Sequence, residues 1–227
     1  MLTRLFAVLL LALPLAASAQ MKWQEGAHYS LLTGSQTTGQ APGKIEVTEV
    51  FSFGCVHCFR AKDAMARLAA ALPPDAAMTY VHASFLSAEG WPMFQRAYYT
   101  ARALGIAETT HEALFKAVWE TGEIPLMDTA TGRVRRPLPT IEDAAKFYAR
   151  VAGVKEADFL KVSNSPAVAT QIARADELVK LWKIPGTPSL VVNGRYLVDS
   201  SALSSWDEFT ALVNHLIGLE RARLGKK

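Results

Sequence analysis

The order of hydrophobic patterns in the first half of the chain limits its fold more than any other feature. Residues 44–53 (KIEVTEVFSF) alternate as a strand does, residues 55–72 carry apolar side chains at helical spacing, and residues 76–85 (AAMTYVHASF) return to a strand pattern. A strand, a helix and a strand in this order form a right-handed crossover between two parallel strands. The sequence therefore predicts an α/β fold built on an open sheet.

Both cysteines of the chain lie where the first strand turns into the helix. Cys55 and Cys58 are two residues apart, at the sheet edge where open α/β folds place their sites. Near the helix start, Cys55 would face N–H groups that lack a partner within the helix and favour a negative charge. A disulfide across so short a loop contributes only about 2 kcal/mol, which a chain of this length does not need. We therefore predict a reactive pair, with a structural staple as the alternative.

The N-terminus has the pattern of a secretory signal peptide. Arg4 is followed by an apolar run, residues 5–17, that closes on Ala17-Ser-Ala19. The run is shorter than the ~18 to 20 apolar residues that a membrane span requires. We predict cleavage after Ala19, which removes residues 1–19 and leaves a periplasmic protein without stable membrane insertion.

The charge of the chain is close to neutral. The formal net charge is +3, and loss of Arg4 with the signal peptide lowers it by one. So small a charge does not favour binding to nucleic acid or to an anionic surface. We expect no nucleic-acid partner, and we expect a monomer.

The middle of the chain shows helical patterns alone. Glycines separate apolar repeats at helical spacing in residues 91–104, 110–121, 140–151 and 155–162. The basic run at residues 133–136 (RVRR) falls in a connector that contains prolines, where a solvated loop is expected. We therefore predict a helical domain, residues 87–164, inserted into a sheet domain made of residues 20–86 and 165–227.

The last part of the chain returns to the sheet. Residues 166–182 predict an amphipathic helix with a proline in its first turn. Two strand patterns, residues 189–192 and 195–198, are joined by Asn193-Gly194, a strong signal for a β-hairpin. A final helix is expected over about residues 205–219, followed by a solvated Arg/Lys tail.

Five short motifs, spread over the chain, point to one known family. They are residues 51–53 (FSF), 55–58 (CVHC), 78–79 (MT), 187–188 (TP) and 192–196 (VNGRY). Through them the sequence resembles the DsbA family of exported thiol:disulfide oxidoreductases over essentially all of the mature chain. The resemblance implies an α/β, thioredoxin-like fold with an inserted all-helical domain.

The resemblance also implies a role for residues around the pair. Cys55 would be the exposed attacking sulfur and Cys58 its buried resolving partner. Pro188 would be a cis proline that faces the disulfide, and the backbone of Thr187 would pair with an extended substrate strand. Glu49, which the strand pattern places among apolar neighbours, would accept the proton of Cys58. The alternative for Glu49 is a carboxylate that only meets a polar partner or water.

The residues inside and beside the motif bear on its redox strength. His57 would donate to a Cys55 thiolate or carry a positive charge near it, and either would lower the pKa of Cys55. A solvent-facing side chain is the alternative for His57. The chain departs from the best-known members of the family at Gly54, at Val56 and at Tyr80, where a buried lysine often accompanies the acid. These departures concern oxidising strength and leave the reaction type unchanged.

The implied activity is that of an enzyme, a protein dithiol:disulfide oxidoreductase with no cofactor besides its own Cys55–Cys58 disulfide. A reduced exported protein would attack Cys55 and receive the disulfide through a mixed-disulfide intermediate. A quinone-linked membrane protein of the DsbB type would then reoxidise the chain.

Two other functions stay open on the sequence. The same chemistry at a different redox poise would make the chain a disulfide isomerase or reductase. Alternatively, Cys55 and Cys58 with His57 or His82 would hold copper or zinc in an exported carrier, although a tetrahedral zinc site requires four ligands. We expect no metal site.

Overall fold

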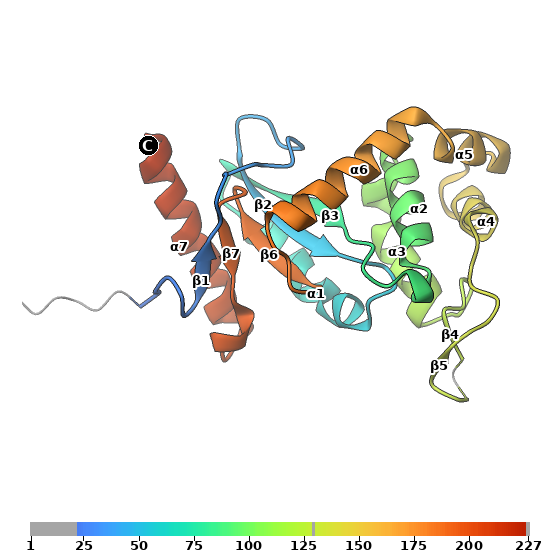
Figure 1. Ribbon diagram of the computed structural model, residues 1–227, viewed down its shortest axis with the longest axis horizontal. Helices are drawn as coiled ribbons and strands as arrows, with labels where there is room; N and C mark the ends of the chain where they lie inside the picture. Colours follow the sequence, from blue (N-terminus) through green and yellow to red (C-terminus); the bar gives the residue numbers. More distant parts are fainter. Residues whose placement is uncertain (1–21, 129, 226–227) are drawn as a thin grey trace, which may run out of the picture.

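The computed structural model describes residues 22–128 and 130–225, and its centre is a five-stranded mixed sheet (Figure 1). The strand order is β1-β7-β6-β2-β3. Strands β2 and β3 are parallel, and the other pairings in this sheet are antiparallel. The strands are β1 (Tyr29–Leu31), β2 (Ile45–Phe51), β3 (Ala76–His82), β6 (Ser189–Val192) and β7 (Tyr196–Val198).

Helix α1 (Val56–Ala71) connects β2 to β3 and confirms the predicted strand–helix–strand unit. It begins directly after Cys55 and ends shortly before Pro73 and Pro74, which cannot continue a helix. Its buried residues Met65 and Leu68 join one apolar cluster with β2 and with helix α7 (Trp206–Leu224). Helices α1 and α7 therefore cover the same face of the sheet.

Helix α6 (Pro166–Leu181) crosses the sheet in Figure 1 and belongs to a second apolar cluster. In this cluster Val168 and Leu178 of α6 lie together with Val50 and Val81 of the two parallel strands. Because helices cover both faces, every residue of β2 is buried, its two glutamates included. The strand that leads to Cys55 is thus the most enclosed segment of the sheet.

The helical insertion lies beyond the β3 end of the sheet, away from α7 (Figure 1). Its helices are η1 (Ser87–Glu89), α2 (Trp91–Ala103), α3 (Ala107–Trp119), α4 (Ile141–Ala152) and α5 (Glu156–Ser163). The insertion is not helical throughout, because β4 (Met127–Asp128) and β5 (Arg133–Val134) form a short antiparallel hairpin. Two-residue strands are too short to give an alternating pattern, which explains why the sequence did not indicate them. We keep residues 87–164 as the proposed bounds of the insertion.

The C-terminal helix is longer than predicted. Helix α7 runs to Leu224, five residues beyond the expected end, and closes on Gly225 with left-handed backbone geometry. The side chain of Arg221 makes two hydrogen bonds of 2.7 and 2.6 Å to the carboxylate of Asp75, directly before β3. The part of the basic tail up to Leu224 is therefore helical and belongs to the folded domain, which corrects its prediction as a solvated end, while residues 226–227 lie outside the described residues.

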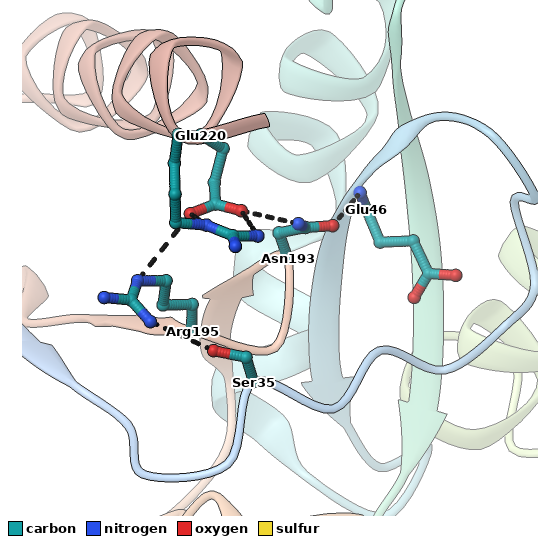
Figure 2. Close-up of polar contacts among 6 residues, drawn as sticks. Ser35, Glu46, Asn193, Arg195 and Glu220 are labelled. Carbon is teal, nitrogen blue, oxygen red and sulfur yellow. Dashed lines mark hydrogen bonds and ion pairs between the residues drawn. The ribbon is translucent and has the colours of Figure 1, made fainter. Parts of the chain in front are cut away.

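The turn of the β6–β7 hairpin is fixed to the rest of the molecule by a polar network (Figure 2). Asn193 and Gly194 both have positive φ angles, as the predicted two-residue turn requires. The amide of Asn193 donates to Glu220 of α7 over 2.6 Å and accepts from the backbone N–H of Glu46 over 3.4 Å (Figure 2). Glu220 is fully buried and also accepts two hydrogen bonds from Arg223. The network joins α7, the hairpin and the start of β2 at the end of β2 far from Cys55.

The predicted signal peptide, residues 1–19, lies outside the described residues. Among the helices that the structure does describe, none combines the length and the apolar character that crossing a membrane demands.

Candidate active site

The turn that leads from β2 into α1 is organised by Ser52. Its carbonyl oxygen accepts from the N–H of Cys55 over 3.0 Å, and its hydroxyl oxygen accepts from the N–H of Gly54 over 3.1 Å. Ser52 is completely buried, so these bonds are not exchanged with solvent. The chain therefore enters the helix in a fixed direction, with Cys55 at its N-cap.

The backbone of Phe53 is held from two sides. Its N–H donates to Nε2 of His82 over 3.2 Å, and its carbonyl accepts from Nε1 of Trp119 over 2.8 Å. His82 lies at the end of β3, and its Nδ1 is 2.8 Å from the carbonyl of Ala83, so Nδ1 is the protonated nitrogen. Burial lowers the pKa of His82 to about 3, which keeps the ring neutral. The insertion, through Trp119, and the sheet, through His82, thus fix the residue that precedes Gly54.

Cys55 and Cys58 are both free thiols, in clearly different surroundings. The sulfur of Cys55 accepts from the backbone N–H of Cys58 over 3.5 Å and lies 3.4 Å from the carbonyl oxygen of Thr187. The Thr187–Pro188 peptide bond is cis, as the resemblance implies. Cys55 is 6% exposed and Cys58 is not exposed at all. Cys55 was expected to be exposed, but it is almost buried and lines a groove.

The pKa values of the two thiols move in opposite directions. A hydrogen bond from the Cys58 side chain, opposed by burial and assisted by Thr187 and by the backbone of Cys58 and His57, lowers the pKa of Cys55 to about 5. Burial, followed by the hydrogen bond to Cys55 and by the charges of Cys55 and Glu49, raises the pKa of Cys58 well above its usual range. At neutral pH the pair therefore holds one thiolate, on Cys55, and one thiol, on Cys58.

Glu49 is a buried carboxyl group on β2 that couples to both thiols. It is 3% exposed, and burial, followed by the charge of Cys55, raises its pKa to about 8. Its neighbour in the sheet register is Tyr80 of β3, whose pKa is raised by burial and then by the charge of Glu49. Glu49 is therefore protonated at neutral pH when Cys55 is a thiolate.

A cavity of about 380 Å³ reaches Glu49 from the side of α1 and α3. Tyr80 and His111 line it together with Glu49, and the rings of Tyr80 and His111 are 5.1 Å apart. Burial lowers the pKa of His111 to about 4, so this ring is neutral at physiological pH. Lys62 and Glu108 are further polar residues of the cavity. The cavity gives the buried carboxyl group a route to solvent that does not pass the cysteines.

The groove above Cys55 has a volume of about 560 Å³ and a mostly apolar lining. Cys55, His57 and Thr187 border it on the sheet domain, and the side chain of His57 is exposed. Within the described part of the chain the imidazole of His57 makes no hydrogen bond, so its contribution to Cys55 is that of its backbone N–H. The segment that follows β3 and the insertion supply the opposite side of the lining, which comprises Phe85, Leu86, Glu89, Trp91, Trp119, Met127 and Val134.

Comparison with known proteins identifies this arrangement. The family of the DSBA-like thioredoxin domain matches residues 46–211 of the chain. The chain belongs to the DsbA family. The thiol:disulfide interchange protein DsbA of Pseudomonas syringae is 30% identical over 208 residues, which cover 92% of this chain and 89% of the relative. The protein of the same name from Azotobacter vinelandii is 31% identical over 181 residues, which cover 80% of this chain and 77% of the relative.

Solved DsbA structures have the same fold. The crystal structure of the oxidoreductase DsbA from Xylella fastidiosa superposes with a TM-score of 0.73 at 30% identity, covering 86% of this chain and 96% of that one. DsbA from Pseudomonas aeruginosa superposes with a TM-score of 0.71 at 29% identity, covering 90% and 97%. The expected thioredoxin-like fold with a helical insertion is thereby confirmed. As a DsbA-family protein, the chain is a thiol:disulfide oxidoreductase that works through its own cysteine pair on protein thiols.

The structure brings all six residues singled out from the sequence to one region. Cys55, Cys58, Thr187 and Pro188 lie at the joint of α1 with the loop before β6, and Glu49 couples electrostatically to the cysteines from β2. His57 is the sixth, at the rim of the groove. Sequence reasoning missed the contributions of Ser52, Trp91, Trp119 and His111, and gave little weight to His82.

One of these omissions left a signal in the sequence. A side chain at position 54 would meet the ring of Trp91, since a Cβ built there lies 2.8 Å from both Nε1 and Cδ1 of the indole. Gly54 before the pair is therefore explained by the close approach of Trp91. A glycine at this position indicates that something packs on the turn, although the sequence does not say what.

The metal-carrier alternative loses support from the geometry of its ligands. Both ring nitrogens of His82 are engaged with backbone groups, those of Phe53 and Ala83, so neither is available to a metal. Across residues 22–128 and 130–225, no group of three or more His, Cys, Asp or Glu side chains is placed to hold a metal ion.

Proposed function

We propose that this chain is a periplasmic dithiol oxidase that donates its Cys55–Cys58 disulfide to reduced exported proteins. The observation that carries the proposal is the position of the Cys55 sulfur at the N-cap of α1, beside the N–H of Cys58, while Cys58 is sealed from solvent. A thiolate held in this way stabilises the dithiol form of the pair relative to the disulfide, which makes the disulfide a good oxidant.

The first step is attack by a substrate thiolate on the sulfur of Cys55. The new bond joins the substrate sulfur to Cys55, the Cys55–Cys58 bond breaks, and its electron pair leaves on Cys58. Protonation of that leaving sulfur is the role we assign to Glu49, whose raised pKa provides a proton near neutral pH. The same carboxylate would take the proton back whenever Cys58 has to act as a nucleophile.

The second step releases the product. Another thiolate of the substrate attacks the substrate sulfur of the mixed disulfide, forms the substrate disulfide and expels Cys55 as a thiolate. Because Cys55 has a pKa of about 5, it is a good leaving group at neutral pH. Overall the substrate dithiol loses two electrons and two protons: the cysteine pair gains both electrons, one proton ends on Cys58, and the other goes to solvent because Cys55 leaves as a thiolate.

We assign Thr187 and Pro188 to substrate positioning. The Thr187 carbonyl lies beside the reacting sulfur, where the backbone of an extended substrate segment can pair with it. His57 is proposed to act on Cys55 through its backbone N–H, which contributes to the lowered pKa. For reoxidation we propose a quinone-linked membrane protein of the DsbB type, the partner that the family resemblance implies.

Replacement of Cys58 with serine tests the nucleophilic role of Cys55. In Cys58→Ser the resolving sulfur is absent, so mixed disulfides between Cys55 and substrate should accumulate when the variant is added, with an oxidant, to reduced unfolded protein. The matched control is Cys55→Ser, whose remaining sulfur is fully buried and should trap nothing. Adducts that form equally well in both variants would remove Cys55 from the reaction.

The direction of the reaction is tested by equilibration with glutathione buffers. An oxidase should have a reduction potential above about −180 mV, the value of protein disulfide isomerase. A potential near that of thioredoxin, about −270 mV, would make the chain a reductase instead.

A further inference from the structure

Glu49 has a buried carboxyl group without a partner in the described part of the chain. It is 3% exposed, and within the described residues it makes no hydrogen bond and no ion pair. Glu46, on the same strand, is also buried, but its carboxylate accepts from Thr38 and from the N–H of Ala41. Buried polar groups in proteins are almost always bonded, because removing an unpaired one from water is costly. Glu49 therefore requires a partner that does not belong to these residues.

The carboxyl group of Glu49 is open to the cavity of about 380 Å³ that it lines together with α1 and α3. Its oxygens are not sealed, unlike the indole nitrogen of Trp91, which has neither a partner nor accessible surface. Among the described residues, none that lines this cavity also lines the groove above Cys55. A molecule in the cavity can therefore reach Glu49 without occupying the groove.

Aromatic rings surround the space in front of Glu49. Tyr80 of β3, Tyr98 of α2 and two residues of α3, His111 and Phe115, line the cavity. The rings of Tyr80 and His111 are 5.1 Å apart, and those of His111 and Phe115 are 5.2 Å apart. The faces of tyrosine and phenylalanine rings attract a cation. The walls of the cavity therefore suit a positively charged group that lies near the carboxylate.

The charged residues around the cavity also favour a cation. Glu108 is exposed at its wall and makes no ion pair within the described residues. A hydrogen bond from Lys116 lowers the pKa of Glu112, and one from Lys62 lowers the pKa of Asp63, so both carboxyl groups stay ionised. Lys62 is the opposing charge, and its ammonium group is bound to Asp63 over 2.8 Å. Among the described residues that line the cavity, acidic side chains thus outnumber lysines.

We propose that this cavity binds a small primary amine, whose ammonium group donates to the carboxylate of Glu49 and lies against the ring of Tyr80. Met65, Met78 and Phe115 offer apolar surface to a compact hydrocarbon body. Pockets of about 300 Å³ and more hold small organic ligands, so the volume is sufficient. An ammonium group bound there keeps Glu49 ionised and competes with the proton transfer that we assign to it. This consequence rests on the proposed function, whereas the binding itself does not.

The test compares benzylamine with benzyl alcohol, which has nearly the same shape and no charge. Titrations of the ¹⁵N-labelled reduced protein are followed by NMR at about pH 8.5, where most of Glu49 is ionised and the amine is still protonated. The dissociation constant of benzylamine should be on the order of 1 mM. That of benzyl alcohol should be at least about tenfold higher, because it lacks a charge-assisted hydrogen bond.

Two variants identify the carboxylate that binds the amine. Glu49→Gln should weaken the binding of benzylamine to the level of benzyl alcohol, and the matched control Glu46→Gln should leave both affinities unchanged. Equal affinities of the amine and the alcohol for the wild type would show a cavity that selects only by shape. That result, no saturable binding of benzylamine, or an equal loss in both variants would each overturn the proposal.

The affinity for benzylamine should also depend on pH through Glu49. Between about pH 6 and 8.5 Glu49 loses its proton in the reduced protein, so benzylamine should bind at least about tenfold more tightly at the higher pH. Burial keeps His111 neutral and keeps Tyr80 and Tyr98 protonated over this range. An affinity that does not change with pH would assign the binding to another group and overturn the proposal.

A second measurement locates the amine in the wild-type protein and does not depend on the folding of a variant. Nuclear Overhauser contacts should connect the protons of bound benzylamine with the ring protons of Tyr80 and His111, which line the cavity. Contacts with other residues in place of these two would put the amine elsewhere and overturn the proposal.

Discussion

Cys55 and Cys58 lie on one turn of helix and differ in proton affinity because each meets a different part of the turn. The Cys55 sulfur is at the N-cap, where N–H groups without helical partners face it, and Cys58 is one turn further on and faces the core. Each thiol also affects the other, since the Cys58 side chain donates to Cys55 and the Cys55 charge opposes ionisation of Cys58. The asymmetry that the proposed mechanism needs is thus a property of the helix start.

At the residue scale, Glu49 should control the ionisation of Cys58. In a mixed disulfide of Cys55 with glutathione, Cys58 must lose its proton before it attacks and releases glutathione. Glu49→Gln should slow this release on the order of a hundredfold near neutral pH. In the wild type the rate should rise with pH as Glu49 ionises, with a midpoint below about 8 because the charge of Cys55 is absent from the mixed disulfide.

Glu46→Gln is the matched control for this prediction. Glu46 is equally buried on the same strand, but its carboxylate accepts from Thr38 and Ala41 at the end far from Cys55. Its substitution should lower stability and leave the release rate and its pH profile unchanged. Equal rates in wild type and Glu49→Gln, measured by stopped flow from pH 5 to 9, would leave Glu49 without a part in proton transfer.

At the scale of elements, the sequence predicted what is encoded locally. The alternation before Cys55, the Asn193-Gly194 turn and the proline at the start of α6 each identify an element from a few neighbouring residues. The β4–β5 hairpin and the last turn of α7 were missed for the opposite reason. The hairpin is too short to show an alternating pattern. The end of α7 is stabilised by the hydrogen bonds of Arg221 to Asp75, a residue that is distant in the sequence.

The buried hydrogen bonds of Glu220 should contribute more to the free energy of unfolding than an exposed ion pair on another helix does. Glu220→Gln removes a carboxylate that accepts from Arg223 and Asn193 inside the protein, and should lower the free energy of unfolding by about 2 kcal/mol. The matched control is Glu177→Gln, which breaks an exposed pair with Arg174 at the same helical spacing and should cost less than about 0.5 kcal/mol. Urea denaturation of both variants checks the difference, and equal losses would contradict it.

At the scale of the whole molecule, the active turn belongs to both parts of the chain. The sheet domain supplies the cysteines, Glu49 and Thr187, while the insertion supplies the indoles of Trp91 and Trp119 and the ring of His111. The second group could not be read from the sequence, because aromatic side chains at helical spacing are usually core residues and nothing in the pattern marks those that face a site. Only the packing of the insertion against the turn shows that they face the site, whereas the cysteine motif and its neighbours were recognisable from the chain itself.

The stability of the whole molecule should depend on pH differently in its two redox forms. The pKa of Cys55 is about 5 in the folded reduced protein and about 8.5 in an unfolded chain. The Cys55 thiolate therefore stabilises the folded reduced protein fully above about pH 8.5, and this stabilisation is lost as pH falls through 5. The oxidised protein has no thiol to titrate. The melting temperature of the reduced form should therefore rise relative to that of the oxidised form from pH 5 to pH 8.

The raised pKa of Glu49 acts in the opposite sense. Its contribution is present below the ordinary pKa of a glutamate and is lost as pH rises through about 8 in the reduced protein. In Glu49→Gln this opposing effect is absent, so the melting temperature of the reduced form should rise more steeply with pH than it does in the wild type. The difference in melting temperature between the reduced and oxidised forms would contradict the lowered pKa of Cys55 if it stayed constant from pH 5 to 8 in both the wild type and Glu49→Gln.

The central claim, that a stabilised Cys55 thiolate makes the pair an oxidant, is tested most directly by titrating that thiolate. The ultraviolet absorbance of thiolate in the reduced protein, with the oxidised protein as the blank, follows the ionisation of Cys55 because Cys58 keeps its proton over the working range. The account predicts a midpoint near pH 5, and no such transition in Cys55→Ser. A midpoint near 8.5, the value of an ordinary cysteine, would contradict it.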